Sequence, residues 1–221
     1  MVHLCVTTTG QSDWREKIRD LDRLGEKAVS VYPTVLKFPE RQEMYEALLA
    51  SGIKHIPHVH LRGDMSEEEA DFFIENFKTE VFTIHAADIA RFFGWEISQK
   101  LFVEFNYSNS KFDLENLNKF GGFCVDLCHF YRARERKTAE FGQISEGVKK
   151  YRVGCNHISG ITPDEDNDHF ITDIRQFDYL DELPDALFSP YPCLEVENGI
   201  ADQLRFREYI IEKLRKRGMD R

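Results

Sequence analysis

The sequence predicts a single (β/α)8 barrel, the TIM-barrel fold, over residues 1–221. Eight short runs rich in valine, isoleucine, phenylalanine and cysteine alternate with amphipathic stretches of helical length. Strands that alternate with helices form βαβ units and a parallel sheet, and eight such units can close into a barrel. No Gly/Ser-rich linker or change of composition divides the chain. One domain is therefore expected, near the lower end of the range of about 200 to over 400 residues for this fold.

The eight predicted strands are short apolar runs spread along the chain. They are residues 3–8 (HLCVTT), 27–33 (KAVSVYP), 55–62 (HIPHVHLR), 81–86 (VFTIHA), 101–106 (LFVEFN), 123–130 (FCVDLCHF), 152–159 (RVGCNHIS) and 192–198 (PCLEVEN). The alternative fold is an open doubly wound sheet, which often carries a glycine-rich phosphate loop after its first strand. Here the first run leads into TTTGQSDW, which has neither G-x-G-x-x-G nor a Walker lysine. The lack of a glycine-rich phosphate loop after the first run favours the barrel.

Three stretches between these runs carry the signals of helices. The segment 66–78 begins with Ser66 as its N-cap, and Glu69 follows at the position that completes a capping box. The segment 39–52 starts with proline and ends with glycine, the asymmetry expected of a helix. The segment 200–217 has an apolar face and gathers positive charge toward its C-terminal end.

The composition is that of an acidic globular protein, with a formal net charge of −10 and 42% hydrophobic residues. The acidity disfavours broad non-specific binding to nucleic acids or membranes, although it does not exclude a local basic groove. No apolar run approaches the length of a membrane helix, and the opening MVHLCVTTTG lacks the pattern of a signal peptide. A cytoplasmic protein without a membrane partner is expected.

The cysteines are odd in number and lie mostly in the strand-like runs. They are Cys5, Cys124, Cys128, Cys155 and Cys193. This distribution predicts buried, reduced thiols and not a disulfide framework. Cys124 and Cys128 are four positions apart with no second pair, so the spacing does not predict a structural zinc site.

Residue types that bind metals recur where the predicted strands end, which is where TIM barrels place their catalytic groups. The third to eighth strands end in His58 and His60, His85, Glu104, Asp126 and His129, His157, and Glu195 and Glu197. Several carboxylates that point into one barrel mouth are costly to bury without a cation to join them. The pattern therefore predicts a divalent metal site at the mouth.

The same strands predict what lies beneath the mouth, because side chains two positions apart on a strand share a face. The residues two positions earlier are His58, Thr83, Phe102, Cys124, Cys155 and Cys193. Most are small or apolar, as expected for a barrel interior. His58 is the exception, and a lone histidine there is expected to be a hydrogen-bonded structural residue.

In order and spacing, these strand ends resemble the xylose isomerase-like superfamily of TIM barrels, which includes sugar isomerases, sugar epimerases and type IV apurinic endonucleases. LFVEFN looks like that family's glutamate-bearing fifth strand, and CVDLCHF matches its D-x-x-H sixth strand. NHISG resembles the seventh strand with its metal histidine, and CLEVEN resembles the L-E-V ending of the eighth. The resemblance spans nearly the whole chain and is weakest over the first two strands. It implies four metal ligands, Glu104, Asp126, His157 and Glu195.

The resemblance also implies additional metal or substrate contacts. These are His60, His85, His129 and His169. His169 lies in the loop ITPDEDNDHFITD, where many family members carry an acid before the histidine. Here the acid is Asp166 or Asp168, because Asn167 occupies the position two residues before the histidine. The chain departs from the family pattern at that position.

The activity implied by the resemblance is that of a divalent-metal-dependent isomerase or epimerase of sugars or sugar phosphates. In this scheme Glu104 and Glu195 both bind the metal and carry the proton. The alternative is a multi-metal phosphodiester hydrolase resembling the apurinic endonucleases, and a third hypothesis is a metal-binding barrel without activity. Histidine and carboxylate ligands together suit manganese, zinc, cobalt or iron, and magnesium is also considered.

A small carbohydrate is the expected partner. Arg62 and Lys37 are the obvious basic residues near the mouth, and either could hold a substrate anion or belong to the surface. The dense basic run 131–137 (YRARERK) alternates with Glu135 and is interpreted as a solvated helix face. A nucleic acid partner is therefore disfavoured but not excluded.

Overall fold

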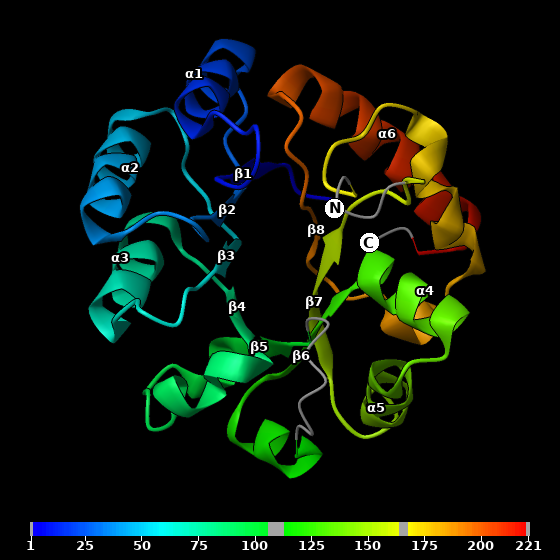
Figure 1. Cartoon of the computed structure of the whole chain (residues 1–221). Coiled ribbons are helices and arrows are strands. Elements are labelled where there is room, and N and C mark those ends of the chain that lie inside the picture. The colour runs from blue at the N-terminus through cyan, green and yellow to red at the C-terminus, as the bar shows by residue number, and fades with distance from the viewer. Residues whose placement is uncertain (1, 106–112, 164–167, 220–221) are drawn as a thin grey trace.

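Eight parallel strands form one sheet in the order β1-β2-β3-β4-β5-β6-β7-β8. The computed structural model describes residues 2–105, 113–163 and 168–219. The strands are β1 (Cys5–Thr7), β2 (Ser30–Tyr32), β3 (His58–His60), β4 (Val81–His85), β5 (Leu101–Glu104), β6 (Gly122–Asp126), β7 (Val153–Ile158) and β8 (Pro192–Leu194). Each strand overlaps the run that predicts it, and Figure 1 shows the helices arranged around the strands. The predicted (β/α)8 barrel is confirmed.

The sheet closes on itself next to β1. His3, just before β1, forms a parallel bridge with Cys193 of β8. The N–H of His3 donates to the carbonyl of Pro192 at 2.9 Å, and the N–H of Leu194 donates to the carbonyl of His3 at 2.9 Å. These two main-chain hydrogen bonds join the first and last strands, so the barrel presents no long unpaired edge at this point.

The connections after the strands are of two kinds. Six α-helices are described, α1 (Trp14–Leu24), α2 (Phe38–Ala50), α3 (Glu67–Phe77), α4 (Leu127–Arg136), α5 (Ala139–Gly147) and α6 (Ile200–Lys216). The connections after β4, β5 and β7 contain short 3-10 helices, η1 (Ala86–Phe92), η2 (Ser98–Lys100), η3 (Leu114–Lys119), η5 (Ile174–Glu182) and η6 (Asp185–Leu187). The outer ring is therefore incomplete as a set of α-helices, in keeping with a barrel of this length.

The helices predicted from capping signals are present. Ser66 caps α3, and the capping box with Glu69 forms as the sequence predicts. The helix predicted over 39–52 begins one residue earlier and ends at Ala50, and its C-cap is Ser51. The sixth strand is shorter than the run 123–130 that predicts it, because β6 ends at Asp126 and α4 begins with the next residue. The side chain of Asp126 caps that helix by accepting from the N–H of His129.

The apolar core lies mainly between the barrel and its outer layer, and a smaller cluster lies inside the barrel. The inner cluster consists of Val81, Phe102, Cys124 and Cys155, with Tyr191 packed against it. All five cysteines are buried and free, which confirms the prediction of reduced thiols. Within the described ranges, no helix has both the length and the apolar character needed to cross a membrane.

The glycine at the start of β6 is required by its backbone. Gly122 has a φ of 127°, and a Cβ placed there would lie 2.1 Å from the carbonyl oxygen of Arg152. We predict that Gly122→Ala lowers the free energy of unfolding by about 2–4 kcal/mol, because strain and overlap both act at this site. Urea denaturation would measure the change. The matched control is Gly142→Ala in α5, where the added Cβ meets open space and stability should rise by up to about 1 kcal/mol. Equal stability of the two variants would contradict the prediction.

Candidate metal centre

Four side chains converge where β5, β6, β7 and β8 end. Glu104 and Asp126 are the last residues of β5 and β6, His157 is near the end of β7, and Glu195 follows β8 directly. One possible ligand atom from each residue lies within 4.8 Å of every other. The four ligands implied by the sequence resemblance are therefore brought together at the C-terminal end of the barrel.

The Glu104 carboxylate lies between two groups of imidazoles. Its Oε1 is 3.1 Å from Nδ1 of His157. Its Oε2 is 3.0 Å from Nε2 of His60 and 3.4 Å from Nε2 of His85. His60, His85 and Glu104 form a second set of possible ligand atoms, again within 4.8 Å of one another. Each oxygen of one carboxylate thus faces a different potential metal position.

His157 supplies positive charge to this cluster. Its Nδ1 is 3.1 Å from Oε1 of Glu104 and 3.1 Å from Oε2 of Glu195. Burial by itself would lower the pKa of His157, but the carboxylates of Glu104 and Glu195 outweigh burial and raise the pKa well above its ordinary value. The two carboxylates therefore favour the positively charged form of His157, at the point where they also favour a cation. The hydroxyl of Thr83, 3.3 Å from Nε2 of His157, helps to fix the orientation of the ring.

One carboxylate oxygen of Asp126 points to a need for another positive partner in the cluster. Its Oδ1 accepts from the N–H of His129 at 2.8 Å. Its Oδ2 is buried and has no hydrogen-bond partner among the described residues, although Nδ1 of His129 lies 3.9 Å away. Burial, and then the nearby glutamates, raise the pKa of Asp126 against the effect of His129. A buried carboxylate oxygen without a donor is costly, and a divalent cation held by the four residues would remove that cost. The mixed imidazole and carboxylate set suits manganese, cobalt, iron or zinc better than magnesium, which prefers oxygen ligands.

His129 and His169 flank the cluster on the side of Asp126 and Glu195. Their ring centroids are 6.2 Å apart, and Nδ1 of His169 is 2.8 Å from the carbonyl oxygen of Glu195. Asp168, one of two acids proposed to act with His169, is instead held by Arg132 at 2.7 Å and by Thr162. The other proposed acid, Asp166, lies outside the described residues, as does Asn167.

The basic residues that the sequence suggested for the mouth are either already paired or exposed at the start of a helix. The guanidinium of Arg62 donates to Asp64 at 2.8 Å and to the carbonyl of Thr34 at 2.9 Å. Lys37 is exposed at the N-cap of α2. In the basic run 131–137, Arg134 pairs with Glu182, and Arg132 is half-buried against Asp168. The run is therefore only partly the solvated face that its sequence indicates.

Tyr32 and Glu140 near the mouth were not identified from the sequence, and Thr83 was expected beneath the mouth without a contact of its own. The ring of Tyr32 packs against the imidazoles of His58, His60 and His157, with centroids 5.2–6.1 Å apart. Thr83 contacts His157 as described above. Glu140, in the first turn of α5, has a buried Oε1 with no hydrogen-bond partner in the described parts of the chain. Burial, and then the charges of Asp126 and Glu104, raise the pKa of Glu140 to about 7 against the effect of His129. Tyr32 is the last residue of β2, and Thr83 lies two residues before the end of β4. A search of the strand ends for all polar residues, and not only for metal ligands, would have pointed to both side chains.

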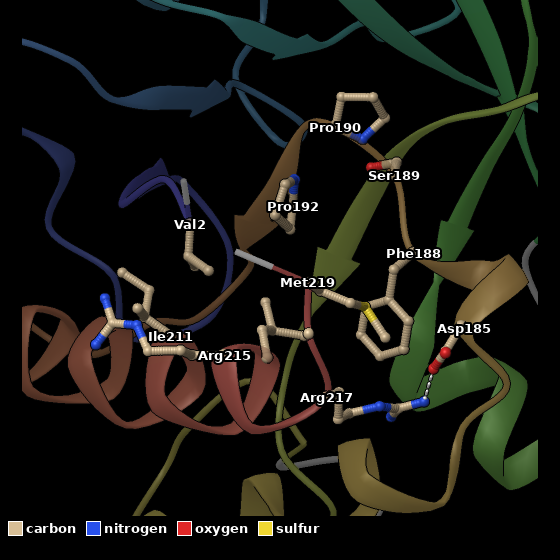
Figure 2. Close-up of a pocket in the computed structure, with 12 residues that line it drawn as sticks. Val2, Asp185, Phe188, Ser189, Pro190, Pro192, Ile211, Arg215, Arg217 and Met219 are labelled. Atoms are coloured by element: carbon tan, nitrogen blue, oxygen red, sulfur yellow. Dashed lines mark hydrogen bonds and ion pairs between the residues drawn. The ribbon is translucent and has the colours of Figure 1, made fainter. Parts of the chain in front are cut away.

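A separate pocket of about 460 Å³ lies at the other end of the barrel. It is formed by residues before β1, at the start of β8 and at the C-terminal end of α6, including Val2, Pro192, Leu214 and Met219. Figure 2 shows the ion pair between Arg217 and Asp185 at one side of this pocket. None of the proposed metal ligands lines the pocket, so it is distinct from the candidate centre.

Comparisons with known proteins give only distant similarities. No protein-family model matches the chain, and no curated protein matches it. The chain is similar to a solved structure described as a D-tagatose 3-epimerase-like protein, with 14% identity, a TM-score of 0.47 and coverage of 97% of both chains. It is also similar to a sugar phosphate isomerase/epimerase from Parabacteroides distasonis, with 9% identity, a TM-score of 0.42 and coverage of 94% of this chain and 91% of that one. The argument for function rests on the residues at the mouth.

The role of Asp126 can be tested without disturbing the helix that it caps. We predict that Asp126→Asn lowers the affinity for Mn²⁺ or Co²⁺ at least about tenfold, because the variant loses a negative ligand. Asparagine is an equally good N-cap, so α4 should stay intact. Isothermal titration calorimetry would measure the affinity, and Glu80→Gln, in an exposed pair with His55, is the control. Unchanged affinity in Asp126→Asn would remove this residue from the site.

Proposed function

We propose that the chain is a divalent-metal-dependent enzyme that isomerises or epimerises a sugar, or a sugar phosphate, by moving a proton next to a carbonyl. One observation carries this proposal. Glu104 and Glu195 come from β5 and from the end of β8, with β6 and β7 between them, and each places an oxygen 3.1 Å from the same nitrogen of His157. Two carboxylates that approach one point from different strands can remove a proton from one side of a substrate and return it on the other.

Glu104, Asp126, His157 and Glu195 would hold the metal, which when bound acts as a Lewis acid on the substrate carbonyl. The chain itself supplies the proton carriers. Burial alone would raise the pKa of Glu104, but His157 and then His60 and His85 outweigh burial and hold the pKa well below its ordinary value. The imidazoles therefore favour the ionised form of Glu104, which is the form that accepts the proton from the carbon next to the carbonyl. The electron pair left behind is delocalised as an enediolate until a carboxylic acid returns the proton.

The two glutamates differ in their access to solvent. The side chain of Glu104 is 3% exposed and that of Glu195 is 15% exposed. A proton held by Glu195 can thus exchange with water more readily than one held by Glu104. Glu195 can therefore return a proton that comes from the solvent, after Glu104 has removed the proton of the substrate.

The charges around the mouth favour a polyol over a polyanion. Arg62 is already paired with Asp64, and Arg132 is already paired with Asp168. A phosphodiester would need such cations to offset its charge, whereas the hydroxyls and carbonyl of a free sugar need only hydrogen bonds and the metal. The chain is also acidic overall, with a net charge of −10. A small carbohydrate is therefore the proposed substrate.

A specific observation favours one alternative, a multi-metal hydrolase of phosphodiesters. His60 and His85 lie against Oε2 of Glu104, while His157 lies against Oε1. A carboxylate that directs its two oxygens to two ligand sets can bridge two metals, and paired metals are typical of phosphodiester hydrolysis. The two proposals differ in the number of metals that activity requires.

The first test is a proton-exchange assay on a panel of aldoses and ketoses in deuterated water with Mn²⁺ or Co²⁺. We expect the active sugar to incorporate deuterium next to its carbonyl, and Glu104→Gln to lower turnover by about 10²–10⁴-fold, because the amide cannot accept the proton. Glu80→Gln is again the control. Turnover in Glu104→Gln equal to that of the wild type would refute the assignment of the proton carrier.

The second test separates the two functions through His85, whose side chain is 36% exposed. If proton transfer at one metal is correct, His85→Ala should keep the metal content per chain of the wild type and sugar turnover within a few-fold of the wild type. If the hydrolase is correct, the variant should lose one metal and its activity on a phosphodiester such as bis(p-nitrophenyl) phosphate. Elemental analysis and both activity assays on the same preparation would decide between them.

A further inference from the structure

A layer of polar and sulfur-containing side chains lies inside the barrel beneath the mouth. All of its members are at most 2% exposed. They are Ser30, His58, Thr83, Cys124, Cys155 and Cys193. The interior layers of TIM barrels are usually filled by bulky branched aliphatic residues. Here strands from several sides of the barrel instead contribute thiols, hydroxyls and an imidazole, so this layer needs an explanation of its own.

Three of these side chains are placed as metal ligands. One ring nitrogen of His58 and the Sγ atoms of Cys124 and Cys155 all lie within 4.8 Å of one another. Cys124 and Cys155 are direct neighbours in the register of β6 and β7, and His58 reaches them from β3 across the interior. Tetrahedral zinc, with Zn–S of about 2.3 Å and Zn–N of about 2.0–2.1 Å, separates its ligand atoms by roughly 3.5–3.8 Å. Small side-chain movements toward a common centre would reach that geometry.

The neighbours of His58 hold its ring in position. Its Nδ1 is 3.2 Å from Sγ of Cys193 and 3.3 Å from the hydroxyl of Tyr32. Its Nε2 is 2.7 Å from Oγ1 of Thr83, and this oxygen is 3.5 Å from Sγ of Cys155. The contacts at Nδ1 fix the orientation of an imidazole that binds a metal through Nε2, where the metal takes the place of the hydrogen bond to Thr83. The Thr83 hydroxyl then lies beside the ligating nitrogen, where it can provide a fourth donor atom.

This sulfur-rich layer differs in chemistry from the candidate centre at the mouth. Its residues stand two positions before mouth residues on the same strands, so they form the next layer inward. The mouth offers carboxylates and imidazoles, while the possible ligand set in the layer beneath consists of two thiols and one imidazole. Thiolate ligands select soft or borderline cations such as zinc. A carboxylate-rich centre and a thiolate site can therefore take different metals in one barrel.

We infer that His58, Cys124 and Cys155 form a second metal site, which binds one zinc ion inside the barrel with the Thr83 hydroxyl as the fourth ligand. The two thiols lose their protons to solvent as two Zn–S bonds form, so one Zn²⁺ replaces two H⁺ and the net charge of the site stays zero. The ion joins β3, β4, β6 and β7 through side chains where aliphatic packing would otherwise do so. Its role is structural, and it does not depend on the reaction at the mouth.

The test uses cobalt as the probe, because cobalt bound to thiolate shows a sulfur-to-metal charge-transfer absorption in the near ultraviolet and the mouth contains no sulfur ligand. The full chain is unfolded with chelator and reductant and then refolded with Co²⁺ alone. We expect the absorption in the wild type and in Glu104→Gln. It should be lost in Cys155→Ser, together with one equivalent of zinc when the proteins are instead refolded with Zn²⁺. Cys128→Ser is the matched control, because Cys128 is also buried but donates to the carbonyl of Gly160 outside this layer.

Two results would overturn the inference. One is a wild type that refolds with Co²⁺ and shows no charge-transfer absorption, a result that needs no variant. The other is a Cys155→Ser variant that keeps both the absorption and its full zinc content. If Cys155→Ser does not fold, Cys124→Ser takes its place. Loss of the absorption in Cys128→Ser as well as in the layer variants would also count against the site.

Discussion

The burial of the Glu104 carboxylate among three imidazoles is the interaction on which the mouth of the barrel depends. A buried carboxylate is strongly unfavourable unless positive charge or hydrogen-bond donors surround it. His60, His85 and His157 meet that need at 3.0–3.4 Å. Once Glu104 is in place, the neighbouring positions cannot be apolar without leaving it unpaired. The accumulation of histidines around Glu104 therefore follows from one electrostatic requirement, and a metal would satisfy that requirement for Glu104, Asp126 and Glu195 together.

Strand register turns this requirement into geometry. His85 pairs with Glu104 between β4 and β5, and Asp126 pairs with His157 between β6 and β7. Residues that are neighbours in a parallel register lie about 5 Å apart across the sheet, so their side chains meet on the same face. The period of two along each strand then places a second set of side chains directly beneath the first. The carboxylate centre and the sulfur-rich layer are thus consecutive layers of a single arrangement.

Local signals predicted most of the fold. The eight apolar runs located all eight strands, and the capping box at Ser66 and Glu69 located the start of α3. Such signals are reliable because they depend on residues only a few positions apart. The connections after β4, β5 and β7 gave no comparable signal and contain 3-10 helices. The path of these connections is set by packing against the barrel, which a local pattern does not record.

The sequence by itself determined which residues stand at the ends of the strands and therefore which side chains reach the mouth. Only the tertiary structure decided how they are grouped. It directed the two oxygens of Glu104 to different imidazoles, tied Asp168 to Arg132, and brought Glu140 close enough for its pKa to respond to Asp126. It also made Cys155 on β7 the neighbour of Cys124 in strand register. Spacing along the chain had suggested only Cys128 as a neighbour of Cys124, and Cys128 lies in α4. The reason is physical: the period along a strand fixes the face of each residue, but its neighbours across the barrel are fixed by register and closure, which depend on hydrogen bonds and packing between strands far apart in the chain.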